Sequence, residues 1–69
     1  MIKYLIIIYW SRDDDAFLAE IPELEGCIAH GDTADEALKE VNIMGEEWLD
    51  IAREKGWVIP EPQGRLIYA

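Results

Sequence analysis

The sequence contains few of the residues that usually support a small fold from within. Its 69 residues include one cysteine, Cys27, and one histidine, His30. A single thiol cannot form an internal disulfide, and one cysteine with one histidine does not supply the ligands of a structural zinc site. A chain of this length buries only about 60% of its unfolded surface, so association with another copy is the remaining support. We therefore expect a single domain over residues 1–69 that has no metal or cofactor and forms a homo-oligomer.

Long hydrophobic runs are also missing. No segment approaches the roughly 20 apolar residues that span a membrane, and the short apolar run after Lys3 is not followed by a small-residue cleavage site. Hydrophobic residues nevertheless make up 51% of the chain, which is generous for so small an interior. These features predict a cytoplasmic protein that does not bind membranes and that covers part of its apolar surface with another chain.

Basic residues are scarce, and their distribution is uneven. The net charge is −9, and the segment from Asp13 to Leu38 holds nine acidic residues and no Lys or Arg, whereas the rest of the chain holds six of each sign. Direct binding to nucleic acid is disfavoured, because phosphate contacts need a basic surface. The acidic segment is either a solvated face that keeps the protein in solution or a surface that attracts a basic protein.

The residue pattern predicts strands in the first half of the chain. Lys3–Trp10 is almost continuously β-branched, aromatic or aliphatic, as expected of a strand that is covered on both faces. Ala16–Ile21 alternates between two faces and is stopped by Pro22. Cys27–His30 is a third strand, and Arg65–Tyr68 could close the sheet as a last one. The short connections between the first three strands predict an antiparallel meander.

The sequence predicts where the third strand ends and a helix begins. Gly31 and Asp32 end the strand, and Thr33 with Glu36 can form a capping box, in which each side chain accepts from the other's backbone N–H. The apolar spacing then predicts a helix from Ala34 to Lys55, with Ala34, Ala37, Leu38, Val41, Met44, Trp48 and Ala52 along one stripe. Gly56 is a natural residue to end this helix, which would be about 33 Å long and would project beyond the sheet.

These motifs together resemble the HicB-type antitoxin domain. The resemblance rests on Ile21-Pro22-Glu23-Leu24-Glu25-Gly26-Cys27, on Gly31-Asp32-Thr33 followed by Asp35-Glu36-Ala37-Leu38, and on Gly56 with Ile59-Pro60-Glu61-Pro62. It implies an α+β fold of order β-β-β-α-β, in which an antiparallel sheet packs against one long helix, a truncated relative of the RNase H architecture without its catalytic carboxylates. It also implies a function, which is to bind and silence a small HicA-type toxin that cleaves mRNA. The oligomer that it implies is a dimer or a tetramer.

The sequence departs from the family at its end. Many HicB-type proteins carry a C-terminal helix-turn-helix or ribbon-helix-helix module that binds DNA, whereas this chain ends at Ala69, directly after the expected last strand. We therefore expect no direct binding of nucleic acid by this chain. Two hypotheses remain open: an antitoxin that neutralises a small basic toxin, and an orphan homo-oligomeric HicB-like module that has a binding or regulatory role and no toxin.

The candidate partner-binding residues follow from charge and position. We expect Asp13, Asp14, Asp15, Glu20, Glu23 and Glu25 to steer a basic partner towards the protein. Trp57, directly after the helix, either contacts another chain or folds back over the helix end. The other two tryptophans, Trp10 and Trp48, are expected in the core.

Enzymatic alternatives have less support in the sequence. Three consecutive aspartates in a turn, Asp13–Asp15, point in different directions and do not converge as a metal site requires. Cys27 and His30 are three residues apart in a strand, so their side chains should lie on opposite faces and cannot form a nucleophile–base pair. We therefore expect no catalytic activity.

Overall fold

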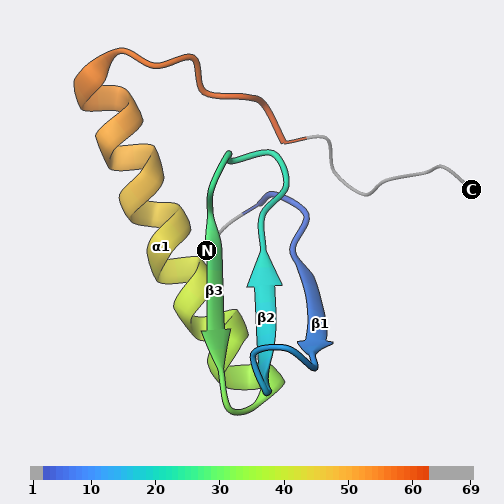
Figure 1. Ribbon diagram of the computed structural model, residues 1–69. Helices are drawn as coiled ribbons and strands as arrows, with labels where there is room; N and C mark the ends of the chain where they lie inside the picture. The colour runs from blue at the N-terminus through green and yellow to red at the C-terminus, as the bar shows by residue number, and fades with distance from the viewer. Residues whose placement is uncertain (1–2, 63–69) are drawn as a thin grey trace, which may run out of the picture.

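The structure, a computed structural model that describes residues 3–62, consists of three strands followed by one helix (Figure 1). β1 (Ile7–Ser11), β2 (Ala16–Glu20) and β3 (Ile28–Gly31) form one antiparallel sheet with β2 in the centre, and α1 spans Ala34–Lys55. The α+β class, the antiparallel meander and the bounds of the helix are confirmed. The expected last strand, Arg65–Tyr68, lies outside the described residues.

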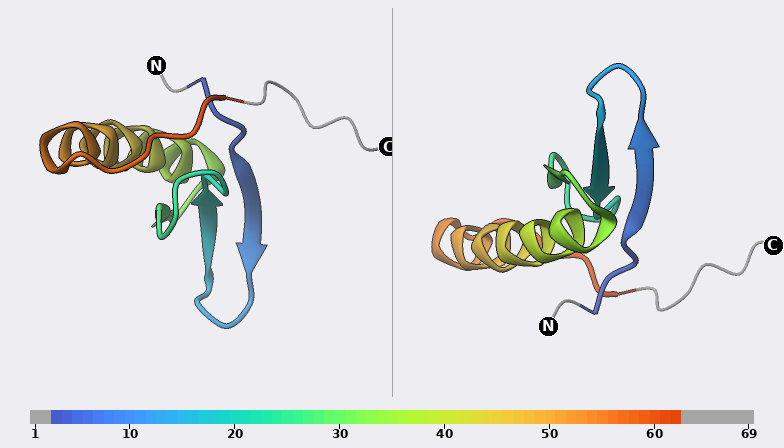
Figure 2. Two further views of the ribbon diagram at one scale, coloured as in Figure 1. Left: turned by 90° about the horizontal axis from the view of Figure 1, so that it is seen from above. Right: turned by 90° about the horizontal axis from the view of Figure 1, so that it is seen from below.

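The pairing register assigns the strand residues to two faces of the sheet. Residues that lie opposite each other on adjacent strands share a face. Ala19 pairs with Ala29 and both are buried, whereas Leu18 pairs with His30, which is exposed. The helix α1 therefore covers the face of Ala19, and the face of Leu18 stays open. Figure 2 shows the helix leaving the sheet at an angle, so that its C-terminal end projects beyond the strands, as predicted from its length.

The strand β1 lies at the edge of the sheet, and the prediction that both of its faces are covered is wrong. It begins at Ile7 rather than at Lys3, and the side chains of Ile7, Ile8, Tyr9 and Trp10 are between 37% and 47% exposed. The physical reason is that the helix packs mainly over β3 and β2 and much less over β1, so the apolar residues of this edge strand are only partly covered.

The prediction that Trp10 belongs to the core is also wrong. Its side chain is 47% exposed and packs edge-on against Phe17, with 5.0 Å between ring centroids and an interplanar angle of 72°. This edge-to-face contact with one neighbouring strand is what an edge position offers an aromatic side chain.

Small side chains allow the helix to approach the sheet closely. Ala19 of β2, Ala29 of β3 and Ala37 of α1 are almost completely buried at the contact. The core cluster consists of Tyr4, Ala19, Ile21, Leu24, Cys27, Ala29, Ala37 and Val41. Among these, Ile21, Leu24 and Val41 are the largest fully buried side chains, and each stabilises the fold by about 1.5–3 kcal/mol through burial of apolar surface.

Both ends of α1 follow the pattern predicted from the sequence. The Thr33 hydroxyl oxygen accepts a hydrogen bond from the Glu36 backbone N–H at 3.1 Å, which is one half of the capping box. The reciprocal bond to the Thr33 N–H is not formed within residues 3–62. At the other end Gly56 adopts φ 73°, a left-handed conformation that glycine accommodates without steric cost, and its N–H donates to the Ala52 carbonyl.

The segment after Gly56 leaves the helix end and runs across the end of the sheet that carries the loop between β2 and β3 (Figure 1). Two hydrogen bonds hold it: the Trp57 N–H donates to the Ala52 carbonyl at 2.9 Å, and the Tyr4 hydroxyl donates to the Pro60 carbonyl. This segment therefore lies beside Tyr4, and at Trp57 and Val58 it lies beside the loop between β2 and β3. In the part of the chain that the structure describes, no helix has the length and hydropathy needed to cross a membrane.

Candidate protein-binding surface

The acidic residues predicted to contact a partner are divided between the two ends of the sheet. Asp13–Asp15 form the turn between β1 and β2, whereas Glu23 and Glu25 lie in the loop between β2 and β3 at the opposite end (Figure 1). Glu20 is the last residue of β2. The length of β2 alone separates the two groups by about 17 Å. The structure therefore presents two acidic sites and not the single patch that sequence proximity suggests.

Two of the three aspartates in the turn have structural roles. The Ser11 hydroxyl donates to the Asp14 carboxylate at 2.8 Å, and the Asp14 N–H donates back to the Ser11 oxygen at 3.3 Å. Asp15 adopts φ 51°, a left-handed conformation that aspartate tolerates better than most residues. Asp13 is exposed and makes no hydrogen bond or ion pair among residues 3–62. At this end Asp13 is therefore the charge that is least tied to the fold.

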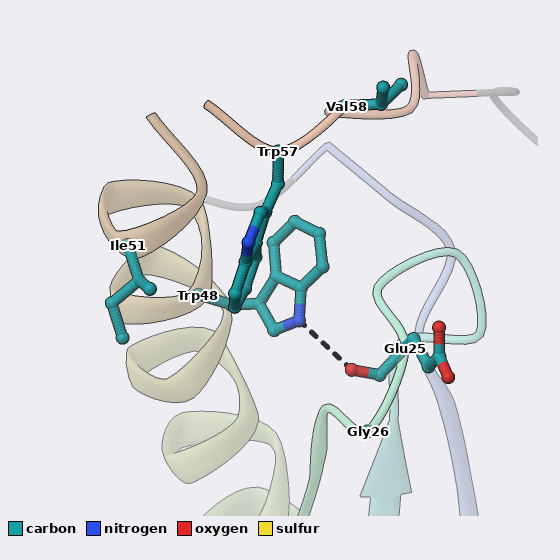
Figure 3. Close-up of a pocket in the computed structure, with 6 residues that line it drawn as sticks. All are labelled: Glu25, Gly26, Trp48, Ile51, Trp57 and Val58. Carbon is teal, nitrogen blue, oxygen red and sulfur yellow. Dashed lines mark hydrogen bonds between the residues drawn. The ribbon is translucent and has the colours of Figure 1, made fainter. Parts of the chain in front are cut away.

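A cavity of about 630 Å³ opens at the other end of the molecule (Figure 3). It lies between the C-terminal half of α1, the loop between β2 and β3, and the segment after α1, and its lining residues are Glu25, Gly26, Trp48, Ile51, Trp57 and Val58. This volume is within the range of small-ligand sites in proteins. The structure thus brings two of the predicted partner-binding residues, Glu25 and Trp57, to one apolar cavity with a carboxylate beside it.

Local structure fixes the two tryptophans of this cavity. The Trp48 indole N–H donates to the Glu25 carbonyl at 3.0 Å, which ties the helix to the loop. The left-handed Gly56 turns the chain so that the Trp57 ring comes beside the Trp48 ring, with 5.8 Å between centroids and an interplanar angle of 60°. Figure 3 shows both rings between Ile51 and the loop.

Trp57 folds back over the helix end and also stays open to contact. Its side chain packs against Trp48, so the expected return over the helix end is confirmed, and at 49% exposure the expected contact with another chain stays a prediction. Trp48 packs against the core cluster and is half-buried rather than fully buried.

Sequence reasoning missed Ile51 and Val58 as members of this site. Ile51 is 42% exposed and Val58 is 90% exposed, so neither is held in the core. Gly56 was the residue in the sequence that could have indicated them. A glycine that ends a helix in the left-handed conformation directs the following residues towards the last turns of that helix. It predicts that Trp57 and Val58 lie near Ile51, which the apolar periodicity of the helix alone does not show.

The carboxylate oxygens of Glu23 are covered and have no hydrogen-bond partner among residues 3–62. A covered carboxylate without a donor is costly, because it loses its water and gains nothing in exchange. The loop that borders the cavity therefore holds an unpartnered acceptor, although Glu23 itself does not line the cavity.

The side chains of Cys27 and His30 diverge, as predicted. Cys27 is 3% exposed and belongs to the core cluster, whereas His30 is exposed on the open face of the sheet, beside a hollow of about 330 Å³ lined by Asp14, Ala16, Leu18, Ile28 and His30. Burial raises the pKa of the Cys27 thiol. Within residues 3–62 no three His, Cys, Asp or Glu side chains are placed to hold a metal ion.

The raised pKa of Cys27 predicts a loss of stability at alkaline pH. In the unfolded chain the thiol ionises at its ordinary pKa, whereas burial keeps it protonated in the folded state. The contribution is complete below the unfolded pKa, and the free energy of unfolding then falls as the pH rises above about 8.5. Urea titrations at about pH 7 and about pH 9.5 measure how much the free energy of unfolding falls between the two conditions. This fall should be smaller for Cys27→Ala than for the natural chain. Equal losses would contradict this account.

The family assignment rests on residues from all three strands and the helix. Residues 8–60 match the UPF0150-like family. The chain belongs to this family. It is 36% identical over 64 residues to UPF0150 protein ssl0259 from Synechocystis sp., and the aligned region covers 93% of this chain and 86% of that protein. No solved structure matches the chain.

The part of this UPF0150-like chain that matches the family includes both ends of the candidate surface. It begins within β1 and extends to Pro60, so it contains the turn at Asp13–Asp15, the loop at Glu25 and the segment that carries Trp57. Neither name describes an activity, and the family assignment therefore leaves the function open.

Proposed function

We propose that this UPF0150-like chain is an antitoxin-like protein-binding domain that neutralises a small basic HicA-type toxin by covering its RNA-binding surface. One observation carries the proposal: the segment from Asp13 to Leu38 holds nine acidic residues and no Lys or Arg. A toxin that cleaves mRNA needs a cationic surface to hold phosphates. An acidic protein surface can occupy the same cations, and the resemblance of the sequence to HicB-type antitoxins supports this role.

The division of the acidic residues suggests how such a complex would form. The charges at both ends of the sheet add to one negative field, which accelerates the approach of a basic protein. Close contact needs apolar surface that can be buried, and the cavity end provides it through Trp57, Ile51 and Val58. We therefore infer that the cavity end is the contact and that the turn at Asp13–Asp15 contributes mainly to the association rate.

The proposal is tested by capture of the partner, followed by an assay of its activity. Tagged protein is used at low salt to retain binding proteins from its native cells, and the eluate is identified by mass spectrometry. A small basic protein in equimolar amount, released by salt, is then purified and assayed for RNA cleavage with and without this chain. Inhibition of cleavage supports the proposal. Self-association with no basic partner points instead to the orphan homo-oligomeric module.

Charge reversal at the two ends should have different effects on the complex. Asp13→Lys leaves the Ser11–Asp14 contact in place and should slow association about two- to tenfold at low salt, with little change in dissociation. Glu25→Lys lies beside the cavity and should also accelerate dissociation. Stopped-flow or surface-binding kinetics at several salt concentrations separate the two. If Asp13→Lys has the larger effect on dissociation, the turn is the contact and our assignment of the interface is wrong.

A further inference from the structure

We propose that the cavity between Trp48 and Trp57 receives an arginine side chain from a basic protein partner. The inference deepens the proposed function and rests on it for the natural partner, but the cavity itself can be tested separately. Its two indole rings, 5.8 Å apart, present aromatic surface at a point where Trp57 is half exposed. A cation over the face of a tryptophan ring is attracted by the negative charge of that face.

The rigid positions of the rings favour a bound cation. The Trp48 ring is held by its hydrogen bond to the Glu25 carbonyl. The Trp57 backbone is held by its bond to the Ala52 carbonyl, and the Trp57 ring packs against Trp48. Neither ring has to be ordered when a ligand enters, so little conformational entropy is lost on binding. The exposed side chains of Ile51 and Val58 offer apolar contact for the methylene groups of a long basic side chain.

The charges around the cavity select a cation. Glu25 lines the cavity, and Figure 3 shows its carboxylate on the loop side, directed away from the two rings. Glu47 and Glu54 lie four residues before and three residues after Ile51, so they share its side of the helix, and both are exposed. The one base on this flank of α1 is Lys55, in the last turn. The surroundings of the apolar cavity are therefore predominantly acidic, which disfavours an acidic or phosphorylated ligand.

Arginine fits this arrangement better than lysine. Its planar and weakly hydrated guanidinium can stack face to face on an indole ring, whereas the lysine ammonium is a compact and strongly hydrated charge. The cavity volume of about 630 Å³ also leaves room for the residues on either side of the arginine. The occupant is therefore an arginine within an extended or helical segment that carries apolar neighbours.

The test uses a short peptide and does not require the natural partner. The probe is an acetylated and amidated peptide, Ala-Arg-Leu-Arg-Ala, compared with the same peptide containing lysine or the neutral arginine analogue citrulline. Binding is followed by NMR of the three tryptophan indole N–H signals of the full chain. We expect the arginine peptide to shift the signals of Trp48 and Trp57 in a saturable way, the lysine peptide to bind several-fold more weakly, and the citrulline peptide to have no effect.

The chain offers a matched control for the tryptophan itself. Trp10 is 47% exposed, close to the 49% of Trp57, but lies at the other end of the molecule. Trp57→Ala should weaken peptide binding about tenfold, and Trp10→Ala should leave it unchanged. Because Trp57→Ala removes a contact with Trp48, the exposed Ile51→Lys serves as a second variant that places a competing cation at the cavity and should abolish binding.

Four outcomes would overturn the proposal. The first is equal shifts of all three indole signals, and the second is equal binding of the arginine and citrulline peptides. The third is a dimer that dissociates in Trp57→Ala during sedimentation, because a second copy would then be the occupant. The fourth is a captured toxin complex that is unaffected by Trp57→Ala and Ile51→Lys. That result would support the antitoxin function and show that the toxin does not bind through this cavity. Conversely, peptide binding without any captured toxin supports the cavity and removes the antitoxin function.

Discussion

Replacement of Gly31 by alanine should lower the free energy of unfolding by about 2–4 kcal/mol, the upper part of the range for overpacked sites. A Cβ atom at this position would lie 2.7 Å from the Ala37 backbone nitrogen and 2.7 Å from the Glu36 Cβ. Both atoms belong to the first turn of α1 and cannot rotate away. The end of β3 and the start of the helix would have to separate, which would open the contact at Ala29 and Ala37.

Gly26→Ala is the matched control for this prediction. Gly26 adopts φ 78° and no atom lies within 4 Å of a Cβ built there, so alanine would meet only backbone strain. That strain costs about 1–2 kcal/mol. Urea unfolding followed by circular dichroism should place Gly31→Ala below Gly26→Ala in stability, and for a domain of this size the first variant should be partly unfolded without denaturant. A Gly31→Ala variant as stable as the natural chain would show that strand and helix are not in contact.

Leu24→Ala should have the second large effect, a loss of about 2–4 kcal/mol in the free energy of unfolding. Leu24 is 1% exposed although it lies in a loop, because the loop closes on itself: the Leu24 N–H donates to the Ile21 carbonyl and the Leu24 carbonyl accepts from the Cys27 N–H, both at 3.0 Å. The side chain thereby fills the core between the sheet and the helix. Alanine would leave a cavity that a turn with these hydrogen bonds cannot collapse to fill.

The same substitution should weaken binding at the Trp48–Trp57 cavity. Leu24 anchors the loop whose next residue, Glu25, accepts from the Trp48 indole, so a loosened loop would release one wall of the cavity. Leu38→Ala is the control, because it makes the same substitution at a leucine that is 37% exposed on the helix. It should lower the free energy of unfolding by less than about 1 kcal/mol and leave peptide binding unchanged. Thermal unfolding and the indole NMR titration measure both quantities in one pair of variants. Unchanged peptide binding in Leu24→Ala would separate the loop from the cavity.

Local sequence patterns predicted the secondary structure well and the exposure of individual residues less well. The helix bounds, the cap at Thr33, the helix end at Gly56 and the divergence of Cys27 from His30 are as expected. Each depends on backbone geometry within a few residues, which a sequence records directly. The predictions that both faces of β1 are covered and that Trp10 lies in the core were wrong. Both depend on how far the helix extends across the sheet.

The candidate site shows the same division. The sequence indicated that Glu25 and Trp57 belong to a binding surface, and it grouped them with Asp13–Asp15 because all six acidic candidates are close along the chain. In the structure an antiparallel hairpin places the two acidic groups at opposite ends of the sheet. Proximity in sequence therefore did not show how the acidic candidates are placed, since the five residues of β2 separate the two groups by about 17 Å.

By itself the sequence determined the order of the elements, the ends of the helix and the negative charge of the first half of the chain. These features depend on residue type and on spacing over one or two turns or strands. Only the tertiary structure decided that β1 stays exposed, that the Glu23 carboxylate is covered with no hydrogen-bond donor among residues 3–62, and that the two tryptophans lie beside the Glu25 loop. The physical reason is that the contact between Trp48 and the Glu25 loop joins residues 23 positions apart, and that the exposure of β1 depends on where the helix crosses the sheet. No local pattern encodes either of these.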